Sequence, residues 1–197
     1  MKKSLFVLTL AALLACPISS AGAATYDIDL DHSTVGFKIR HLLSNVRGTF
    51  DRFSGTLTFE PGKPELWKVE AVIQSESINT NVAERDKHLR SADFFDAEKY
   101  PAITFKSTNV TLVDEQHAKV EGLFSMHGVE KLVTLDVEIH GVAKDPWGNV
   151  RAAFTATTML NRKDFGIVYN QTLETGGVLI GEDVQVTIEI EGLQKEA

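Results

Sequence analysis

The chain has 197 residues and an acidic balance, with 27 Asp and Glu residues against 20 Lys and Arg residues. A chain of this length is expected to form one domain whose core needs no metal or disulfide staple. The acidic charge argues against a general nucleic-acid binder, which needs a basic surface to displace the counterions of phosphates. With 11 Phe residues and 24% charged residues, the composition also excludes a disordered chain.

The first 23 residues have the pattern of a cleaved export signal. A positive Lys2-Lys3 pair precedes an apolar run over 5–15, which is too short to span a bilayer as a stable helix. Small residues end the segment at Ala23, as a signal peptidase requires. We therefore predict cleavage before Ala24 and a periplasmic location.

Cys16 is the only cysteine, and two alternatives to simple cleavage involve this part of the chain. The Leu14-Ala15-Cys16 sequence could end a lipoprotein signal, which would place a lipid on Cys16. The segment could also be retained as an anchor. If cleavage occurs before Ala24, the mature protein has no thiol and can use neither a thiolate metal site nor a disulfide.

Beyond residue 24 the dominant pattern is an alternation of apolar and polar residues, which is typical of antiparallel strands with one dry face. The alternation is clearest over 35–40, 133–140 and 184–191. Weaker strand candidates are 25–30, 46–52, 55–60, 67–75, 103–112, 118–126 and 150–158. Because adjacent short runs can belong to one bent strand, the pattern predicts about eight to ten strands.

Polar turns separate these runs, at 61–64, 114–116 and 145–149 for example, and no repeat or linker interrupts the chain. We therefore predict a single domain over 24–197. Many evenly spaced strands favour either a sandwich or an up-and-down barrel, and periodicity does not decide between them. An eight-stranded barrel can hold one ligand, whereas a sandwich fills its core with side chains.

The segment 81–100 departs from the strand pattern. It is charged, lacks alternation and contains good helix formers, and Pro101 limits it by disfavouring helix at Tyr100. We predict a short helical insertion around 81–100, of a kind that often serves as a lid or plug.

A series of motifs spans nearly the whole chain after the signal. They are His32-Ser33-Thr34-Val35-Gly36-Phe37, His41-Leu42, Gly48-Thr49-Phe50, Ser77-Ile78-Asn79-Thr80, the charged stretch 85–95, Tyr100-Pro101, Gly128-Val129 and Asp164-Phe165-Gly166. In this order they resemble the YceI-like family of bacterial polyisoprenoid-binding proteins, and the stretch 85–95 is the most specific. The resemblance implies an all-β, eight-stranded antiparallel lipocalin-like barrel, an apolar cavity for a long prenyl chain and a periplasmic home.

The candidate cavity residues are apolar side chains from different predicted elements. They are Phe37, Ile39, Phe50, Phe59, Ile73, Phe105, Phe124, Phe154 and Phe165. Any one of them could be an ordinary core residue, because apolar residues mostly pack. The ligand-binding interpretation applies to the set, since ligand sites are mostly apolar concavities with a few polar groups.

The polar candidates lie in the charged insertion. Arg85, His88 and Arg90 could donate hydrogen bonds to a phosphate or quinone head group. Alternatively, an Arg85–Asp86 or Asp86–His88 network could fix the insertion against the barrel. His32 and His41 have no third ligand at a recognisable spacing, so no metal site is predicted.

These features predict a periplasmic, non-enzymatic binding or carrier protein, without a cofactor, for a long-chain isoprenoid or related amphiphilic lipid. The ligand would be of the polyprenyl phosphate or quinone type, and its exchange could involve transient contact with a membrane surface. Two alternatives stay open: an enzyme that acts on such a lipid, and a stress-response protein that interacts with other proteins. The sequence contains no Gly-x-Ser-x-Gly nucleophile elbow.

Overall fold

The computed structural model describes residues 23–174 and 176–196, so the predicted signal and Cys16 lie outside the described residues. The strands are β1 (Ala24–Ile28), β2 (Thr34–His41), β3 (Ser44–Phe50), β4 (Phe53–Phe59), β5 (Lys68–Gln74), β6 (Ile78–Asn79), β7 (Ala102–Leu112), β8 (His117–Met126), β9 (Val129–Lys144), β10 (Val150–Asn161) and β11 (Ile180–Gln194). The helical elements are α1 (Ala83–Arg90) and four 3-10 turns, η1 (Leu30–His32), η2 (Pro64–Leu66), η3 (Ser75–Ser77) and η4 (Arg162–Phe165).

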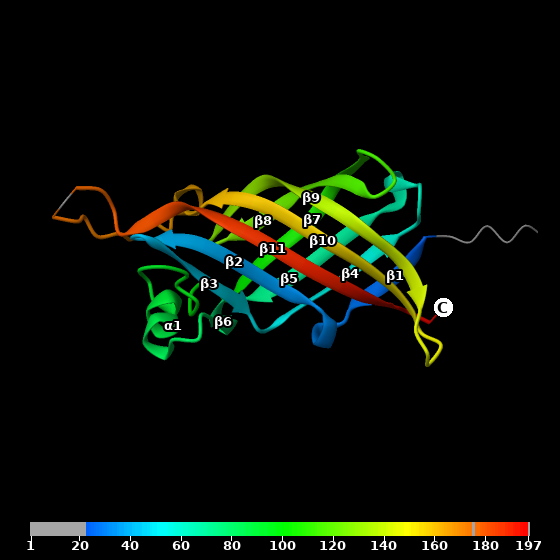
Figure 1. The fold of residues 1–197 in the computed structure, drawn as a ribbon, viewed down its shortest axis with the longest axis horizontal. Helices are drawn as coiled ribbons and strands as arrows, with labels where there is room; N and C mark the ends of the chain where they lie inside the picture. Colours follow the sequence, from blue (N-terminus) through cyan, green and yellow to red (C-terminus); the bar gives the residue numbers. More distant parts are fainter. Residues whose placement is uncertain (1–22, 175, 197) are drawn as a thin grey trace, which may run out of the picture.

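The strands form one sheet in the order β1-β4-β5-β7-β8-β9-β10-β11-β2-β3-β6, and an additional pairing of β1 with β11 closes it into a ring (Figure 1). β11 pairs with β1 near its end, where Ile28 faces Gly192, and with β2 further back, where Thr34 faces Glu189. β1 and β2 are therefore two halves of one bent strand.

The same bend recurs in the next strand, because β4 pairs with β1 while β3 pairs with β2. With these halves joined, the fold is the closed, eight-stranded antiparallel barrel that the resemblance implied. The ring of pairings decides between barrel and sandwich, which the alternation alone could not do.

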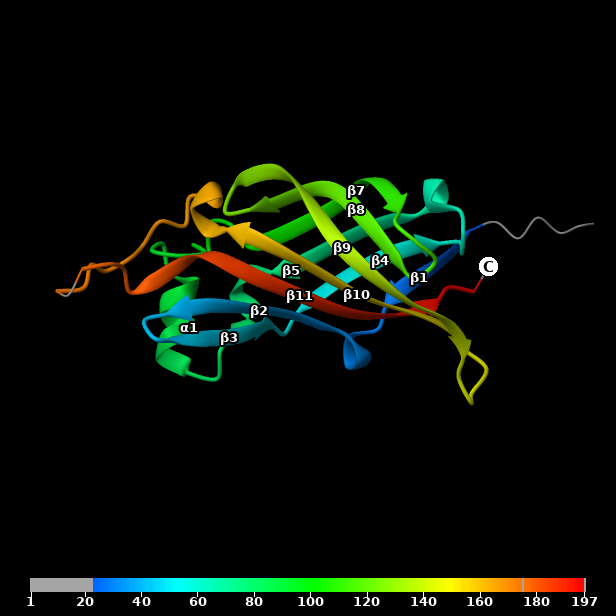
Figure 2. The ribbon, with the colours of Figure 1, turned by 45° about the horizontal axis from the view of Figure 1, so that its top comes forward.

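The predicted insertion contains a helix, although α1 takes only eight residues of it and turns fill the part up to residue 100. α1 lies beside β3 and β6 at one end of the barrel, here called the α1 end (Figures 1 and 2). Leu89, Phe94 and Phe95 from the insertion pack against the apolar core. The insertion therefore covers the barrel where β3 pairs with β6 through only Thr49 and Phe50.

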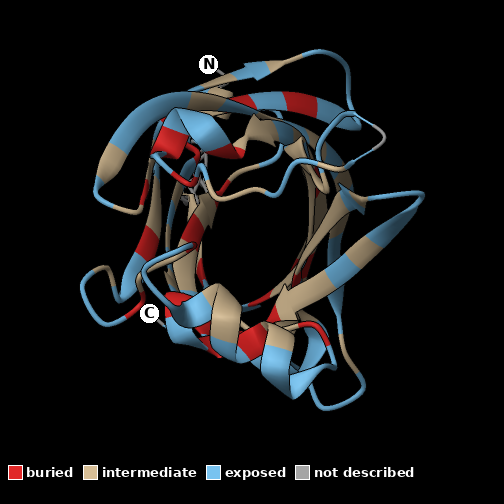
Figure 3. Cartoon of the chain, turned by 90° about the vertical axis from the view of Figure 1, so that its left-hand side faces the viewer, coloured by how far each residue is buried: buried red, intermediate tan, exposed pale blue. Residues whose placement is uncertain are grey.

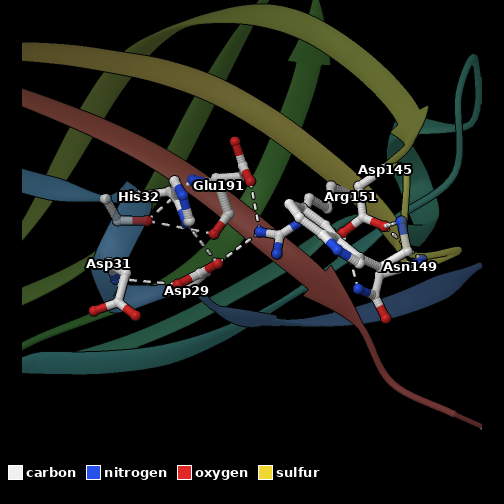
Figure 4. Close-up of polar contacts among 9 residues, drawn as sticks. Asp29, Asp31, His32, Asp145, Asn149, Arg151 and Glu191 are labelled. Carbon is white, nitrogen blue, oxygen red and sulfur yellow. Dashed lines mark hydrogen bonds and ion pairs between the residues drawn. The ribbon is translucent and has the colours of Figure 1, made fainter.

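An ion-pair network lies at the opposite end of the barrel (Figure 4). Arg151 of β10 contacts carboxylate oxygens of Asp29 at 2.6 Å, Asp145 at 3.1 Å and Glu191 at 2.6 Å. Hydrogen bonding from Arg151 lowers the pKa of Asp29 to about 2. Burial raises the pKa of Asp145, but hydrogen bonds from Asn149 and Arg151 outweigh it and lower the pKa to about 2.

This Arg151 network joins three parts of the chain that are distant in sequence: the turn after β1, the β9–β10 hairpin and the end of β11. It therefore ties the bent first strand to the strands that close the barrel.

No helix within 23–174 and 176–196 is long and apolar enough to cross a membrane.

Candidate functional site

An apolar chamber of about 470 Å³ occupies the interior of the barrel. Every strand from β1 to β11 contributes to its lining, together with α1 and residues Ile167, Tyr169, Gln171 and Leu179. Figure 3 looks along the barrel from the α1 end and shows the strands surrounding this interior. On β10 the lining positions are Phe154, Ala156, Thr158 and Leu160, two residues apart, as expected for one face of a strand.

All but one of the apolar candidates from the sequence line this chamber. The lining candidates are Phe37, Ile39, Phe50, Phe59, Ile73, Phe105, Phe124 and Phe154. Phe165 does not belong to the lining: it lies in η4, is 2% exposed and packs edge-on against Phe124 with 5.3 Å between ring centroids. The local pattern of the sequence could not show that the Phe165 ring packs against Phe124 and does not itself line the chamber.

Two glycines make room for aromatic rings in the chamber wall. A Cβ atom at Gly48 would lie 2.5 Å from the Phe37 ring, and one at Gly122 would lie 2.4 Å from the Phe105 ring. A glycine inside a strand often marks such a close approach, and this was the signal available in the sequence. The position of these two predicted rings therefore depends on glycines that were not among the predicted cavity residues.

The end of the chamber away from α1 is aromatic. The Phe59 ring centroid lies 4.6 Å from the Trp67 ring and 4.9 Å from the Phe154 ring. The indole nitrogen of Trp67 donates a hydrogen bond of 2.6 Å to the Glu60 carbonyl, so the ring is fixed by a backbone contact. The indole nitrogen is the polar atom of these three rings, and its hydrogen bond to Glu60 is already made. This end can therefore enclose the tail of an apolar ligand.

The α1 end of the chamber carries polar side chains. They are His41, Arg85, His88, Arg162, Tyr169 and Gln171. The His88 ring contacts Phe94 and Tyr169, each edge-on at 5.0 Å between centroids, and its Nε2 atom lies 2.8 Å from Asp93 Oδ2. Of the predicted head-group candidates, Arg85 and His88 are thus brought together at one end of the chamber.

Arg85 and Asp86 share a partner that the sequence did not indicate. Asp86 is 7% exposed and accepts hydrogen bonds from the backbone nitrogen and the hydroxyl group of Thr80. Arg85 Nε donates to Thr80 Oγ1 at 2.7 Å, and Arg85 Nη2 donates to the Thr80 carbonyl at 2.9 Å. The predicted Arg85–Asp86 and Asp86–His88 pairs do not form among the described residues, since Thr80 and Asp93 take their places.

Arg90 differs from the other two head-group candidates in its position. Its side chain does not line the chamber. Arg90 Nε donates to the Glu76 carbonyl at 2.6 Å, and Arg90 Nη2 donates to the Ile78 carbonyl at 2.9 Å. Arg90 therefore fastens the end of α1 to the chain around β6 and, unlike Arg85 and His88, does not lie in the chamber wall.

Arg162 lines the chamber and was not singled out in the sequence. It begins η4, directly after β10, and it continues the inward positions of that strand by two residues beyond Leu160. The even spacing from Phe154 onward was the signal that could have identified it.

The two histidines considered for metal binding lie at opposite ends of the barrel. His41 lines the α1 end, whereas His32 sits near Asp29 and Glu191, with one ligand atom of each of the three within 4.8 Å of the others. Oxygens of Asp29 and Glu191 already contact Arg151 at 2.6 Å. Arg151 supplies the positive charge that a metal ion would bring to these carboxylates.

The YceI-like domain matches residues 26–192 of the chain. The chain belongs to the YceI-like family. The protein YceI of Escherichia coli O157:H7 is 43% identical over 199 residues, which cover 100% of both chains. A UPF0312 protein of Vibrio cholerae serotype O1 is 39% identical, over 99% of this chain and 100% of the relative.

Solved structures show the same fold. A Campylobacter jejuni YCEI protein is 36% identical, with a TM-score of 0.69, and the match covers 81% of this chain and 91% of that one. A domain from Saccharophagus degradans described as polyisoprenoid binding is 16% identical, with a TM-score of 0.67, over 88% and 99% of the two chains. At this low identity the second likeness concerns the fold alone.

Proposed function

We propose that this protein is a periplasmic binding or carrier protein for a long-chain isoprenoid or related amphiphilic lipid, of the polyprenyl phosphate or quinone type. The observation that supports this function most directly is the chamber of about 470 Å³, lined from every strand by mostly apolar side chains. Apart from three threonines, its polar side chains gather at the α1 end, which suits a ligand with one polar end. The description of the Saccharophagus degradans domain as polyisoprenoid binding agrees with this assignment.

The energetics favour a carrier over a permanent trap. A prenyl chain of roughly 40 carbons would gain about 30 kcal/mol on leaving water, at ~0.8 kcal/mol for each buried CH₂ group. Noncovalent affinities reach only about 20 kcal/mol, and a bilayer offers the chain equally apolar surroundings. A chamber in which the free energy of the prenyl chain is similar to that in the bilayer is therefore sufficient for exchange in both directions. This function needs neither catalysis nor a cofactor.

The proposal is tested by native mass spectrometry of protein expressed with its full sequence and purified from the periplasmic fraction. We expect a protein that begins at Ala24 and carries a prenyl lipid, or takes one up stoichiometrically when a prenyl phosphate or a quinone is added. A barrel that stays empty with both would contradict lipid carriage. A mass that retains Met1, or a lipid on Cys16, would contradict the predicted processing.

The β2–β3 hairpin supports exchange with a membrane surface. Leu43 at its tip is 94% exposed, and the backbone nitrogen of Leu42 donates a 2.8 Å hydrogen bond to the carbonyl of Leu179, which lines the chamber. On the outer face, Lys38 and Arg47 lie directly opposite each other. Two like charges at such a position repel each other, and within the described residues neither side chain has a carboxylate at salt-bridge distance. An anionic bilayer would accept both the leucine and these charges.

Replacing Leu43 with Ser is expected to weaken binding to vesicles of phosphatidylglycerol and phosphatidylethanolamine about tenfold. A leucine buried in a membrane contributes ~1.5–3 kcal/mol, part of which the interface retains. The matched control is Val113→Ser, which removes a 62% exposed apolar residue at the opposite end of the barrel. Vesicle sedimentation measures both variants. Equal binding of Leu43→Ser and the unchanged protein would remove the hairpin from this role.

A further inference from the structure

Arg162 is a buried cation in the wall of the apolar chamber. Its side chain is 4% exposed and belongs to the chamber lining at the α1 end. Two of its nitrogens hold backbone carbonyls: Nε donates to Gly181 at 2.9 Å and Nη1 donates to Ile167 at 2.8 Å. These bonds fix the guanidinium between the start of β11 and the segment that follows η4.

The third nitrogen of this guanidinium has no partner. Among the described residues, Arg162 Nη2 is the single buried side-chain nitrogen or oxygen without a hydrogen-bond partner. Buried polar groups are almost always satisfied, and leaving a charged donor unpaired is more costly than leaving a neutral one. Within the described residues the other buried side-chain donors and acceptors are satisfied, so Arg162 keeps an unused donor in the wall of the chamber that it lines. Because Nη2 is itself covered, an acceptor inside the chamber reaches it when the neighbouring side chains shift.

The charge of Arg162 is not neutralised either. The nearest acidic influence comes from Glu182, whose carboxylate pairs with Lys163 and is not within salt-bridge distance of Arg162. Burial lowers the pKa of Arg162, and Glu182 raises it in part. An arginine side chain nevertheless stays protonated in proteins, so the wall of the apolar chamber contains a positive charge.

We propose that Arg162 is the internal anchor of the chamber and that its Nη2 group donates a hydrogen bond to a negatively charged oxygen on the ligand head group. This inference rests on the proposed lipid-carrying function and specifies its ligand class: a long-chain amphiphile with an oxyanion, either a phosphate or a carboxylate. A neutral quinone carbonyl could accept the hydrogen bond, but it would leave the charge uncompensated. An anionic oxygen satisfies both the donor and the charge.

The position of Arg162 also sets the depth of the head group. Because the side chain is only 4% exposed, an oxygen bonded to Nη2 lies inside the barrel, beyond the exposed surface of α1. The apolar tail then runs toward Phe59, Trp67 and Phe154 at the other end. Arg85 and His88, which also line the α1 end, belong to the insertion itself.

The anchor is tested with two ligands that differ only in the head group, geranylgeranyl monophosphate and geranylgeraniol, titrated into delipidated full-length mature protein. We expect the unchanged protein to bind the phosphate at least tenfold more tightly than the alcohol, and Arg162→Met to lose that preference while still binding the alcohol. Equal affinity of the unchanged protein for both ligands would overturn the anchor and leave the carrier function intact. Binding of neither ligand would overturn the carrier function itself.

Arg90→Met is the matched control, because Arg90 also holds two backbone carbonyls but does not line the chamber. We expect it to reduce thermal stability and to keep the preference for the phosphate. A folded Arg162→Met protein that keeps the preference, or an Arg90→Met protein that loses it, would contradict the assignment.

A measurement on the unchanged protein remains decisive if Arg162→Met does not fold. The ³¹P resonance of bound geranylgeranyl monophosphate is recorded while a water-soluble paramagnetic chelate is added. A phosphate held at Arg162 is expected to show relaxation enhancement several-fold smaller than that of free phosphate. Full enhancement would place the head group outside the barrel and overturn the proposal.

Discussion

Replacing Ala156 with Phe is expected to reduce the affinity for a long prenyl ligand about 100-fold without destabilising the protein. Ala156 is 9% exposed and its side chain faces the chamber from the middle of β10. A ring placed there occupies the path of the tail, and displacing about four CH₂ groups costs ~3 kcal/mol at ~0.8 kcal/mol each. The same ring fills empty apolar volume, so the melting temperature of the ligand-free protein should stay equal or rise.

The control for this prediction is Thr157→Phe, which places the same ring on the outer face of the same strand, next to Asp136 and Thr187. Isothermal titration with geranylgeranyl monophosphate and differential scanning calorimetry measure the two effects. Unchanged affinity in a folded Ala156→Phe protein would show that the ligand does not occupy the chamber. Comparable losses in both variants would point to a general effect of the added ring.

Replacing Arg151 with Met is expected to lower the melting temperature by several degrees at neutral pH. The substitution leaves the carboxylates of Asp29, Asp145 and Glu191 together without their shared cation, and their side chains are only 16%, 8% and 30% exposed. Removing one partner from a poorly solvated network is more damaging than losing a surface pair. The closure between the first and last strands should therefore loosen.

The effect of Arg151→Met should also depend on pH in a defined direction. Asp29 and Asp145 have folded-state pKa values of about 2, below the unfolded value of about 3.9. Groups with a lowered pKa stabilise the fold above the unfolded pKa, and this contribution is lost as pH falls through the folded pKa. The difference in melting temperature between the two proteins should thus be largest above about pH 5 and shrink between about pH 4 and pH 2.

Thermal unfolding monitored by circular dichroism across this pH range checks the prediction. Lys106→Met is the matched control, because it removes an ion pair with Glu70 in which both side chains are more than half exposed, 69% and 60%. We expect little change in its melting temperature at any pH. A Lys106→Met protein as unstable as Arg151→Met would show that burial of the network is not what matters.

The local pattern of the sequence was sufficient for the strands and for much of the chamber wall. In an antiparallel strand, side chains two residues apart share a face, so Val35, Phe37 and Ile39 could be assigned to one side before any pairing was known. The loss of alternation over 81–100 likewise marked the insertion that contains α1. Motif resemblance supplied the barrel, which periodicity alone could not, and it suggested the ligand class that we propose.

The candidate site was less predictable where a side chain had more than one possible direction. Arg85, His88 and Arg90 lie within six consecutive residues, yet the first two line the chamber and the third turns to the carbonyls of Glu76 and Ile78. On a helix, neighbouring residues point in different directions, and only the docking of α1 against β6 decides which of them faces the chamber. Phe165 is a related case, since its ring packs against Phe124 of the chamber lining and is not itself part of that lining.

The sequence by itself determined which residues share a strand face and which segment is inserted, because both depend on periods of a few residues. The tertiary structure alone decided the closure of β1 on β11, the gathering of Asp29, Asp145 and Glu191 around Arg151, and the unpaired nitrogen of Arg162. Asp29 and Arg151 are 122 positions apart, and no local pattern links them. Contacts of this kind exist only once distant strands have been paired in register, and the same is true of a hydrogen-bond donor that is left without a partner.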